Sequence, residues 1–344
     1  MGVTVDALRM AKRRRAEAHA AANRRFDVRS LLFGAPKPHS PGFRDRELEI
    51  EAATEALEQA VASPRCETQP PRAYKVLTVT SNKGGVGKTT VATNLAVFLR
   101  ALREDLPILL IGLDDQEQID RMFSLSEAPT HRDVVTSFLD GSFASAIRFG
   151  QYGVHYIPSS SNLERLKFEI RDTERLRDTL DASGWEGLVI VDTKSDLGIL
   201  TRNAVAASDL VIVPVGDDPS LREAVKIFEL LKAWGRPQST ACVLLSMIDR
   251  RIKYRCGDDD NALECDVLSL LVGEIRKRDY PLFESVLSRS PKVESLATNP
   301  EGRTLNICNH ARNSLVHLQM RHLAEEVLKR LDRIEVSAPR DEIG

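Results

Sequence analysis

The stretch Lys75–Thr90 reads KVLTVTSNKGGVGKTT. Its first half, residues 75–81, is rich in β-branched and apolar side chains, which favours a strand. Glycines crowd the middle of the stretch, and a helical apolar period then continues from Lys88 to Arg103. Strand, glycine-rich turn and helix in this order begin an α/β fold, and the rest of the chain can be compared with that expectation.

The glycine-rich turn has the chemistry of a phosphate site. Several backbone N–H groups must point at one anion, and glycines at 84, 85 and 87 allow unusual dihedral angles without a side chain in the way. The helix that begins here adds its positive end. Lys88 can reach the outer phosphates, and Thr89 can place its hydroxyl on a magnesium ion. We therefore expect ATP and Mg2+ here, held by Lys83, Gly84, Gly85, Val86, Gly87, Lys88, Thr89 and Thr90.

Further apolar runs of strand length alternate with helical segments along the chain. The expected strands are residues 108–113, 154–158, 188–192, 210–215 and 242–247. The expected helices are residues 163–180, 201–207, 221–234, about 261–278, and 309–333. Continuous apolar strands separated by helices are typical of a mostly parallel sheet with helices on both faces, so we predict a doubly wound α/β domain of the P-loop NTPase type. Its ligands should lie at the carboxyl ends of the strands.

The composition changes near residue 70. Residues 1–72 read as an extension, helical or partly disordered, that carries a basic helix over 5–26, a Pro/Gly loop over 34–42, an acidic helix over 46–62 and a linker. We assign residues 73–335 to the ATPase domain and 336–344 to a C-terminal tail.

The bulk composition excludes several classes of protein. The 344 residues carry a net charge of −2, which excludes a globally basic nucleic-acid binder but not a local basic patch. Five scattered cysteines without a C-x-x-C pair indicate neither a disulfide framework nor a zinc site. We see no signal peptide, and the apolar runs fall short of the ~20 residues that a membrane helix needs, so we expect a cytoplasmic protein without a membrane partner.

The phosphate loop also indicates a family. KGGVGKTT, residues 83–90, resembles the deviant Walker A loop of the ParA/MinD ATPases, and the resemblance extends over about residues 74–335. That family has a signature lysine near the start of the loop, which is Lys83 here. The resemblance implies that Lys83 reaches across a nucleotide-sandwich homodimer to the phosphates of the second subunit. A second cation there would neutralise charge that develops on the γ-phosphate.

The second expected strand carries another matching segment. ILLIGLDDQ, residues 108–116, resembles the second strand and switch I of partition ATPases, which read D-x-D-P-Q after the apolar residues. Asp114 matches the aspartate that positions or activates the attacking water, and Gln116 matches the glutamine. Gly112 stands in place of the first aspartate and Asp115 in place of the proline, which leaves the rate of hydrolysis open. The catalytic candidates are then Lys83, Lys88 and Asp114.

Two later strands supply the metal and base candidates. LVIVDT, residues 188–193, resembles Walker B, in which a carboxylate at the end of a buried strand holds the water shell of the metal. That carboxylate is Asp192, which with Thr89 forms the expected Mg2+ site. The usual Pro-Pro of the family is replaced after this motif by Lys194-Ser195. VLLSMID, residues 243–249, resembles the strand that ends near the adenine, so Met247 and Asp249 are candidates for base contacts.

The resemblance implies a cycle that ATP switches. In partition proteins the ATP dimer coats nucleoid DNA non-specifically, and a ParB-like or cargo-adaptor protein stimulates hydrolysis and releases it. Plasmids, chromosomes or protein cargo are moved in this way, so we expect a nucleoid-associated protein in the cytoplasm. Contacts to DNA phosphates would be salt-sensitive and independent of base sequence. The candidates for these contacts are Arg276, Lys277, Arg278, Lys292, Arg303 and Arg312.

Two alternatives remain open at this point. A MinD-like positioning ATPase would hold a membrane with a C-terminal amphipathic helix, but residues 336–344 contain Pro339 and two acids and cannot form one. The apolar stripe before them favours packing on the sheet and comprises Leu315, Leu318, Leu323, Val327, Leu328 and Leu331. The second alternative, motivated by Gly112, is a nucleotide-dependent scaffold that binds ATP, dimerises and hydrolyses little.

Overall fold

The computed structural model describes residues 72–114, 118–125, 132–249, 251, 253–256, 263–296, 298 and 303–336. All of them belong to one unit, residues 58–344, of the two units into which the chain divides. The predicted extension and tail lie outside the described residues except for Arg72 and Val336, and so do Asp115 and Gln116. The interpretations of these segments therefore stay predictions.

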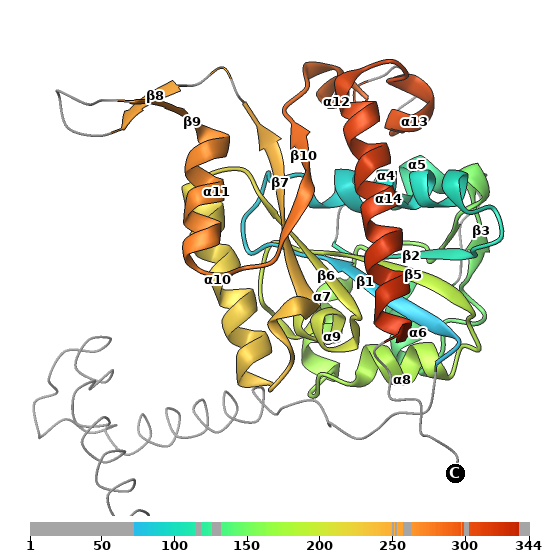
Figure 1. The fold of residues 1–344 in the computed structure, drawn as a ribbon. Helices are drawn as coiled ribbons and strands as arrows, with labels where there is room; N and C mark the ends of the chain where they lie inside the picture. The colour runs from blue at the N-terminus through green and yellow to red at the C-terminus, as the bar shows by residue number, and fades with distance from the viewer. Residues whose placement is uncertain are drawn as a thin grey trace, which may run out of the picture. The chain divides into compact units, whose positions relative to one another are not determined.

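The main sheet has eight strands, which alternate with helices along the chain (Figure 1). They are β1 Tyr74–Val79, β2 Ile108–Leu113, β3 Arg148–Phe149, β4 His155–Tyr156, β5 Gly187–Thr193, β6 Leu210–Val215, β7 Ala241–Ile248 and β10 Leu282–Ser288. Their order across the sheet is β10-β7-β6-β1-β5-β2-β4-β3. All neighbours are parallel except β3 and β4. The prediction of a mostly parallel α/β sheet is confirmed.

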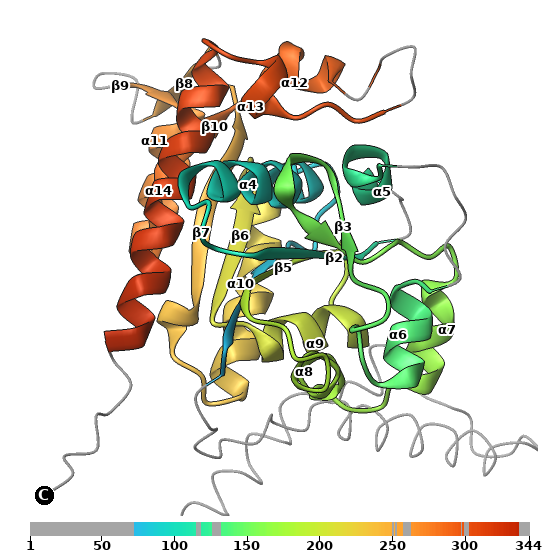
Figure 2. The ribbon, with the colours of Figure 1, turned by 90° about the vertical axis from the view of Figure 1, so that its right-hand side faces the viewer.

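Helices cover both faces of this sheet. One face packs against α4 Lys88–Leu102, α5 Gln118–Phe123, α13 Ile307–His310 and α14 Leu315–Val336. The other face packs against α6 Val134–Asp140, α7 Leu163–Glu169, α8 Arg175–Asp181, α9 Ile199–Ala207, α10 Asp218–Ala233 and α11 Val267–Lys277. A short α12, Pro291–Ser295, follows β10. In Figure 2, α14 passes beside α4, where the ring centroids of Phe98 and His317 lie 5.1 Å apart.

Alternation along the strands explains the two faces. In β1, Leu77 and Val79 belong to the apolar cluster under α4, whereas Val76 belongs to the cluster under α6 to α9. Successive side chains of a strand point to opposite faces, so a strand that is apolar on both faces must be covered twice. The continuous apolar runs therefore correspond to a doubly wound sheet, as predicted.

The predicted helix over 163–180 is wrong in its middle, where it breaks into α7 and α8. The cause is Asn203, a fully buried residue of α9. Its amide accepts a 2.9 Å hydrogen bond from the N–H of Leu176 and donates a 2.7 Å hydrogen bond to the carbonyl of Asp172. A continuous helix would join these two backbone groups directly. Because Asn203 takes both of them, the helix must stop and begin again.

The predicted helix over 261–278 is wrong at its start. Residues 263–266 form β9, which pairs antiparallel with β8, Lys253–Cys256. Asp266 then accepts a 2.8 Å hydrogen bond from the N–H of Ser269 and caps α11. The sequence pattern also indicated no strand at β10, whose alternating residues bury Phe283 and leave Glu284 exposed at the edge of the sheet.

The predicted helix over 309–333 begins later than expected. Asn313 has a φ of 63°, in the left-handed region, and the long helix α14 starts only at Leu315. Leu315 and Leu318 are 62% and 51% exposed, so the first part of the apolar stripe does not pack on the sheet. None of the described helices is both long enough and apolar enough to span a membrane.

A residue of α5 packs directly against Gly112 of β2. A Cβ atom at Gly112 would lie 2.8 Å from Cδ1 of Ile119, whose side chain is 3% exposed. Contacts between carbon atoms have their optimum near 3.5–4.0 Å, so a side chain at 112 fits only if the end of the Ile119 side chain shifts. Ile119 thus occupies the space that the first aspartate of the resembling switch I motif would need.

We expect Gly112→Ala to lower the free energy of unfolding by about 1–3 kcal/mol, because the added methyl group overpacks the core at Ile119. Chemical denaturation of the full chain measures this. The matched control is Gly273→Ala in α11, where an added Cβ meets no atom within 4 Å, and which should stabilise slightly through helix propensity.

A second substitution, at Ile119, should relieve the destabilisation caused by Gly112→Ala. Ile119→Val removes Cδ1, the atom that a Cβ at 112 would strike. In that background the cost of Gly112→Ala should fall by at least about half, as expected for two side chains in contact. An equal cost in both backgrounds would contradict this packing.

Candidate nucleotide-binding site

The phosphate loop joins β1 to α4 and turns through two glycines. Gly85 and Gly87 have φ angles of 78° and 87°, which favour glycine. Gly87 is the N-cap of α4, and a Cβ there would lie 3.3 Å from Oγ of Ser246. Gly84 has no positive φ, so only two of the three glycines, Gly85 and Gly87, use the left-handed region. Val86, between these two glycines, is buried.

The outer end of the loop is held by two acidic residues near the start of α10. Nζ of Lys83 lies 2.6 Å from Oδ2 of Asp217, and Asn82 donates a hydrogen bond to Glu223. Burial alone would raise the pKa of Asp217, but hydrogen bonds from Lys83 and Ser220 bring it below its ordinary value. Sequence reasoning missed both acids, because 134 residues separate Lys83 from Asp217 and 141 separate Asn82 from Glu223.

Lys88 begins α4 and is almost fully buried, with 7% of its surface exposed. Its Nζ donates hydrogen bonds to the carbonyl oxygen of Lys83, at 3.3 Å, and to Oγ of Ser195. Burial lowers the pKa of Lys88, and the carboxylates of Asp192 and Asp114 oppose that effect. The ammonium group therefore lies inside the loop, where a phosphate site requires a cation.

Asp192 is the second-last residue of β5 and is 2% exposed. Burial raises the pKa of this carboxyl to about 7, and a hydrogen bond from Thr89 works in the opposite direction. Its Oδ1 is buried and has no hydrogen-bond partner among the described residues. A buried carboxylate oxygen without a donor, next to the Thr89 hydroxyl, fits the coordination sphere of Mg2+, directly or through water. Thr89 and Asp192 could therefore hold the metal, as predicted from the sequence.

Asp114 follows β2 and lies at the carboxyl ends of the strands. It lines one small pocket with Gly112 of β2 and with residues from four other segments, namely Thr89, Gln118, Ile119, Ser159 and Asp192. The structure thus brings the predicted catalytic aspartate to the two predicted metal residues. Sequence reasoning missed Ile119 and Ser159, because neither belongs to a motif and only the folded sheet places them here. The roles of these residues stay predictions.

The two base candidates differ in position. Met247 has a φ of 61°, in the left-handed region, and its Cγ lies 3.7 Å from where a Cβ of Gly87 would stand. It is therefore next to the phosphate loop, where a nucleotide base could be reached. Asp249 instead pairs with Arg251 at 2.6 Å, and this partner lowers the pKa of Asp249 to about 2. Its carboxylate is engaged locally, so the geometry favours Met247.

The basic candidates for DNA contact are all exposed but form two groups. Arg276, Lys277 and Arg278 end α11 and precede β10, whereas Lys292, Arg303 and Arg312 follow it. The seven residues of β10, about 23 Å of strand, separate the groups. In the first group Lys277 and Arg278 both pair with Glu274, at 2.7 and 2.8 Å. The sequence did not indicate this division.

Comparison with known proteins places this site in a family. A family model described as "AAA domain" matches residues 74–232. The chromosome partitioning protein ParA of Caulobacter vibrioides is 31% identical over 192 residues, which cover 52% of this chain and 71% of that protein. The chromosome-partitioning ATPase Soj of Thermus thermophilus is 29% identical over 262 residues, which cover 74% of this chain and 96% of that protein.

Solved structures agree on the fold. A plasmid partition protein from Borrelia burgdorferi, bound to AMPPNP, has a TM-score of 0.58 at 20% identity and covers 74% of this chain and 99% of its own. The described chain combines the mostly parallel sheet of these proteins with a phosphate loop whose first lysine is Lys83. The chain therefore belongs to the ParA/MinD family of P-loop ATPases.

Proposed function

We propose that this chain is an ATPase that dimerises with ATP, binds DNA non-specifically and partitions or positions a plasmid, a chromosome or another cargo. The observation that carries the proposal is Lys83, a second lysine at the mouth of a loop that already contains Lys88. Lys83 is bound to Asp217 in a pair whose side chains are 33% and 49% exposed. Such an exposed pair contributes less than about 1 kcal/mol, so Lys83 can leave it for a phosphate.

The remaining residues have complementary roles in this proposal. The backbone from Gly84 to Thr90 and the Lys88 ammonium bind the phosphates of ATP. Thr89 and Asp192 hold Mg2+, which would neutralise phosphate charge when bound. Asp114 lies in the same pocket and orients the attacking water. Met247, beside Gly87, contacts the base.

The proposed switch is a difference in contacts between two nucleotide states. With ATP, Lys83 of each subunit binds the γ-phosphate in the facing subunit; after hydrolysis that ligand is gone. A ligand can shift an equilibrium only by its differential affinity for the two states, and this contact supplies it. A ParB-like or cargo-adaptor protein would stimulate hydrolysis and release the dimer from the nucleoid.

Lys83→Ala should leave nucleotide binding nearly unchanged and abolish the nucleotide-dependent dimer, because only the contact between subunits is lost. Light scattering with Mg2+ and a non-hydrolysable ATP analogue measures the dimer, and calorimetry measures binding. Lys232→Ala, an exposed lysine at the end of α10, is the matched control and should dimerise normally. An unchanged dimer fraction in Lys83→Ala would refute the sandwich assignment.

DNA binding should require ATP, ignore base sequence and weaken steeply with salt, because it rests on phosphate contacts. A gel shift at several salt concentrations measures this. Arg276→Glu and Lys292→Glu each test one of the two basic groups, with Arg222→Glu, a 75% exposed side chain on α10, as the control. A charge reversal in the group that contacts DNA should reduce the slope of log affinity against log salt concentration by about one to two. No shift with ATP at low salt would exclude the nucleoid proposal.

One observation favours a second candidate, a nucleotide-dependent scaffold that hydrolyses little. Ile119 fills the space beside Gly112, so the pocket lacks the first carboxylate of the D-x-D-P-Q motif of partition ATPases. Steady-state turnover with and without DNA and the partner protein separates the two candidates. Turnover that the partner stimulates and that Asp114→Ala abolishes would exclude the scaffold.

A further inference from the structure

The loop after β5 places a hydroxyl group inside the phosphate site. Lys194 and Ser195 stand there in place of the usual Pro-Pro of the family. Oγ of Ser195 accepts a hydrogen bond from Nζ of Lys88. The same oxygen would lie 3.8 Å from a Cβ atom at Gly84. Ser195 therefore lies over the outer part of the loop, and a proline at this position could offer no such group.

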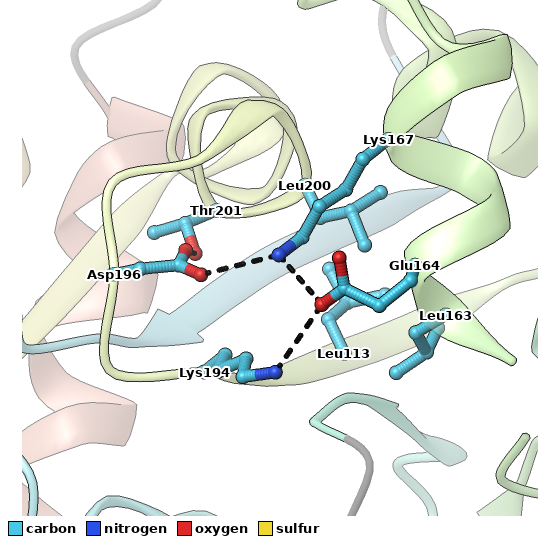
Figure 3. A pocket seen from close by; sticks show the side chains of 8 residues that line it. All are labelled: Leu113, Leu163, Glu164, Lys167, Lys194, Asp196, Leu200 and Thr201. Carbon is cyan, nitrogen blue, oxygen red and sulfur yellow. Dashed lines mark hydrogen bonds and ion pairs between the residues drawn. The ribbon is translucent and has the colours of Figure 1, made fainter. Parts of the chain in front are cut away.

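The two neighbours of Ser195, Lys194 and Asp196, contact charged side chains of α7 (Figure 3). Lys194 pairs with Glu164 of α7 at 3.5 Å. Asp196 accepts a 2.9 Å hydrogen bond from the N–H of Gly198 and lies 3.7 Å from Nζ of Lys167. Figure 3 shows these charged side chains converging between α7 and the loop. The residues on both sides of Ser195 thus make contacts with α7 in the ligand-free chain.

The Ser195 hydroxyl can still donate a hydrogen bond. Its oxygen accepts from Lys88, and within the described part of the chain no acceptor takes its proton. A hydroxyl is both a donor and an acceptor, and a phosphate oxygen bound by Lys88 would be an acceptor beside it. Hydrogen bonds from a hydroxyl to an anionic oxygen are among the strong ones.

The position of Ser195 selects one phosphate over the others. The inner phosphates of a nucleotide lie at the N-terminus of α4, over Gly87 to Thr89. Ser195 lies instead toward Gly84, and the carbonyl of Lys83 shares the Lys88 ammonium with it. This end of the loop is farther from the helix, where the terminal phosphate of ATP would extend and where ADP would have none.

We propose that Ser195 donates a hydrogen bond to the γ-phosphate and is a specificity-determining residue by which this chain distinguishes ATP from ADP. The inference rests on the proposed ATP site and deepens it. The residue comes from this chain's own departure from the Pro-Pro pattern, so the discrimination would be a property of this protein rather than of the loop that it shares with its relatives.

The test compares Ser195→Ala with the unchanged chain in its affinity for ADP and for AMPPNP, both with Mg2+, by calorimetry. A lost hydrogen bond to a charged group should weaken AMPPNP binding about 10-fold or more. ADP binding should change less than about 3-fold, because ADP lacks the acceptor. The measurement is repeated in the Lys83→Ala background, so that nucleotide-dependent dimerisation does not contribute to the ratio.

Three further variants make the outcome specific. Ser195→Thr keeps the hydroxyl and should restore the preference for AMPPNP. Ser195→Pro introduces a residue usual in the family and should lose the preference as Ser195→Ala does, which provides a second variant if the first folds poorly. Ser145→Ala, an exposed serine far along the chain, should change neither affinity.

Each outcome decides between the claims. Equal weakening of ADP and AMPPNP, or no weakening of either, would overturn the role of Ser195 while leaving the ATP site intact. A chain that binds neither nucleotide before any substitution would overturn the proposed function itself. Selective loss of AMPPNP binding with rescue by Ser195→Thr is the result that supports the inference.

Discussion

The site depends on the register of three neighbouring parallel strands, β1, β5 and β2. In the register of β1, β5 and β2, Asp192 faces Val79 on one side and Gly112 on the other. The phosphate loop begins just beyond Val79, and Asp114 stands just beyond Gly112. A shift of one residue would turn every side chain of a strand to the opposite face. The register therefore decides that the loop, the buried carboxylate and Asp114 meet.

Buried charged groups explain why the ends of these strands are suited to a nucleotide and its metal. Lys88 and Asp192 are both almost fully buried, and burial disfavours the charged form of each. Phosphate oxygens would add negative charge beside Lys88, and a divalent cation would add positive charge beside Asp192. Without a ligand, Ser195 and the carbonyl of Lys83 accept hydrogen bonds from the Lys88 ammonium group. The site is thus polar and preorganised, as a site that stabilises charge must be.

Much of the fold could be predicted because strand and turn signals are local. The runs 108–113 and 210–215 are the observed β2 and β6. The errors have long-range causes: Asn203 breaks the helix at Leu176, and β8 pairs with residues 263–266. Neither effect has a signal within a short window of sequence. The edge strand β10 was also invisible to a search for continuous apolar runs, since it is buried on one side only.

The sequence by itself determined the phosphate loop, because left-handed turns at Gly85 and Gly87, the lysine and the threonine are all encoded within a few neighbouring residues. It also indicated Asp114 just after one apolar strand and Asp192 at the end of another. Only the tertiary structure decided which groups these residues meet: Asp217 at Lys83, Ser195 at Lys88 and Ile119 at Gly112. Those contacts join segments that are distant along the chain, and only the packing of helices on the sheet brings them together.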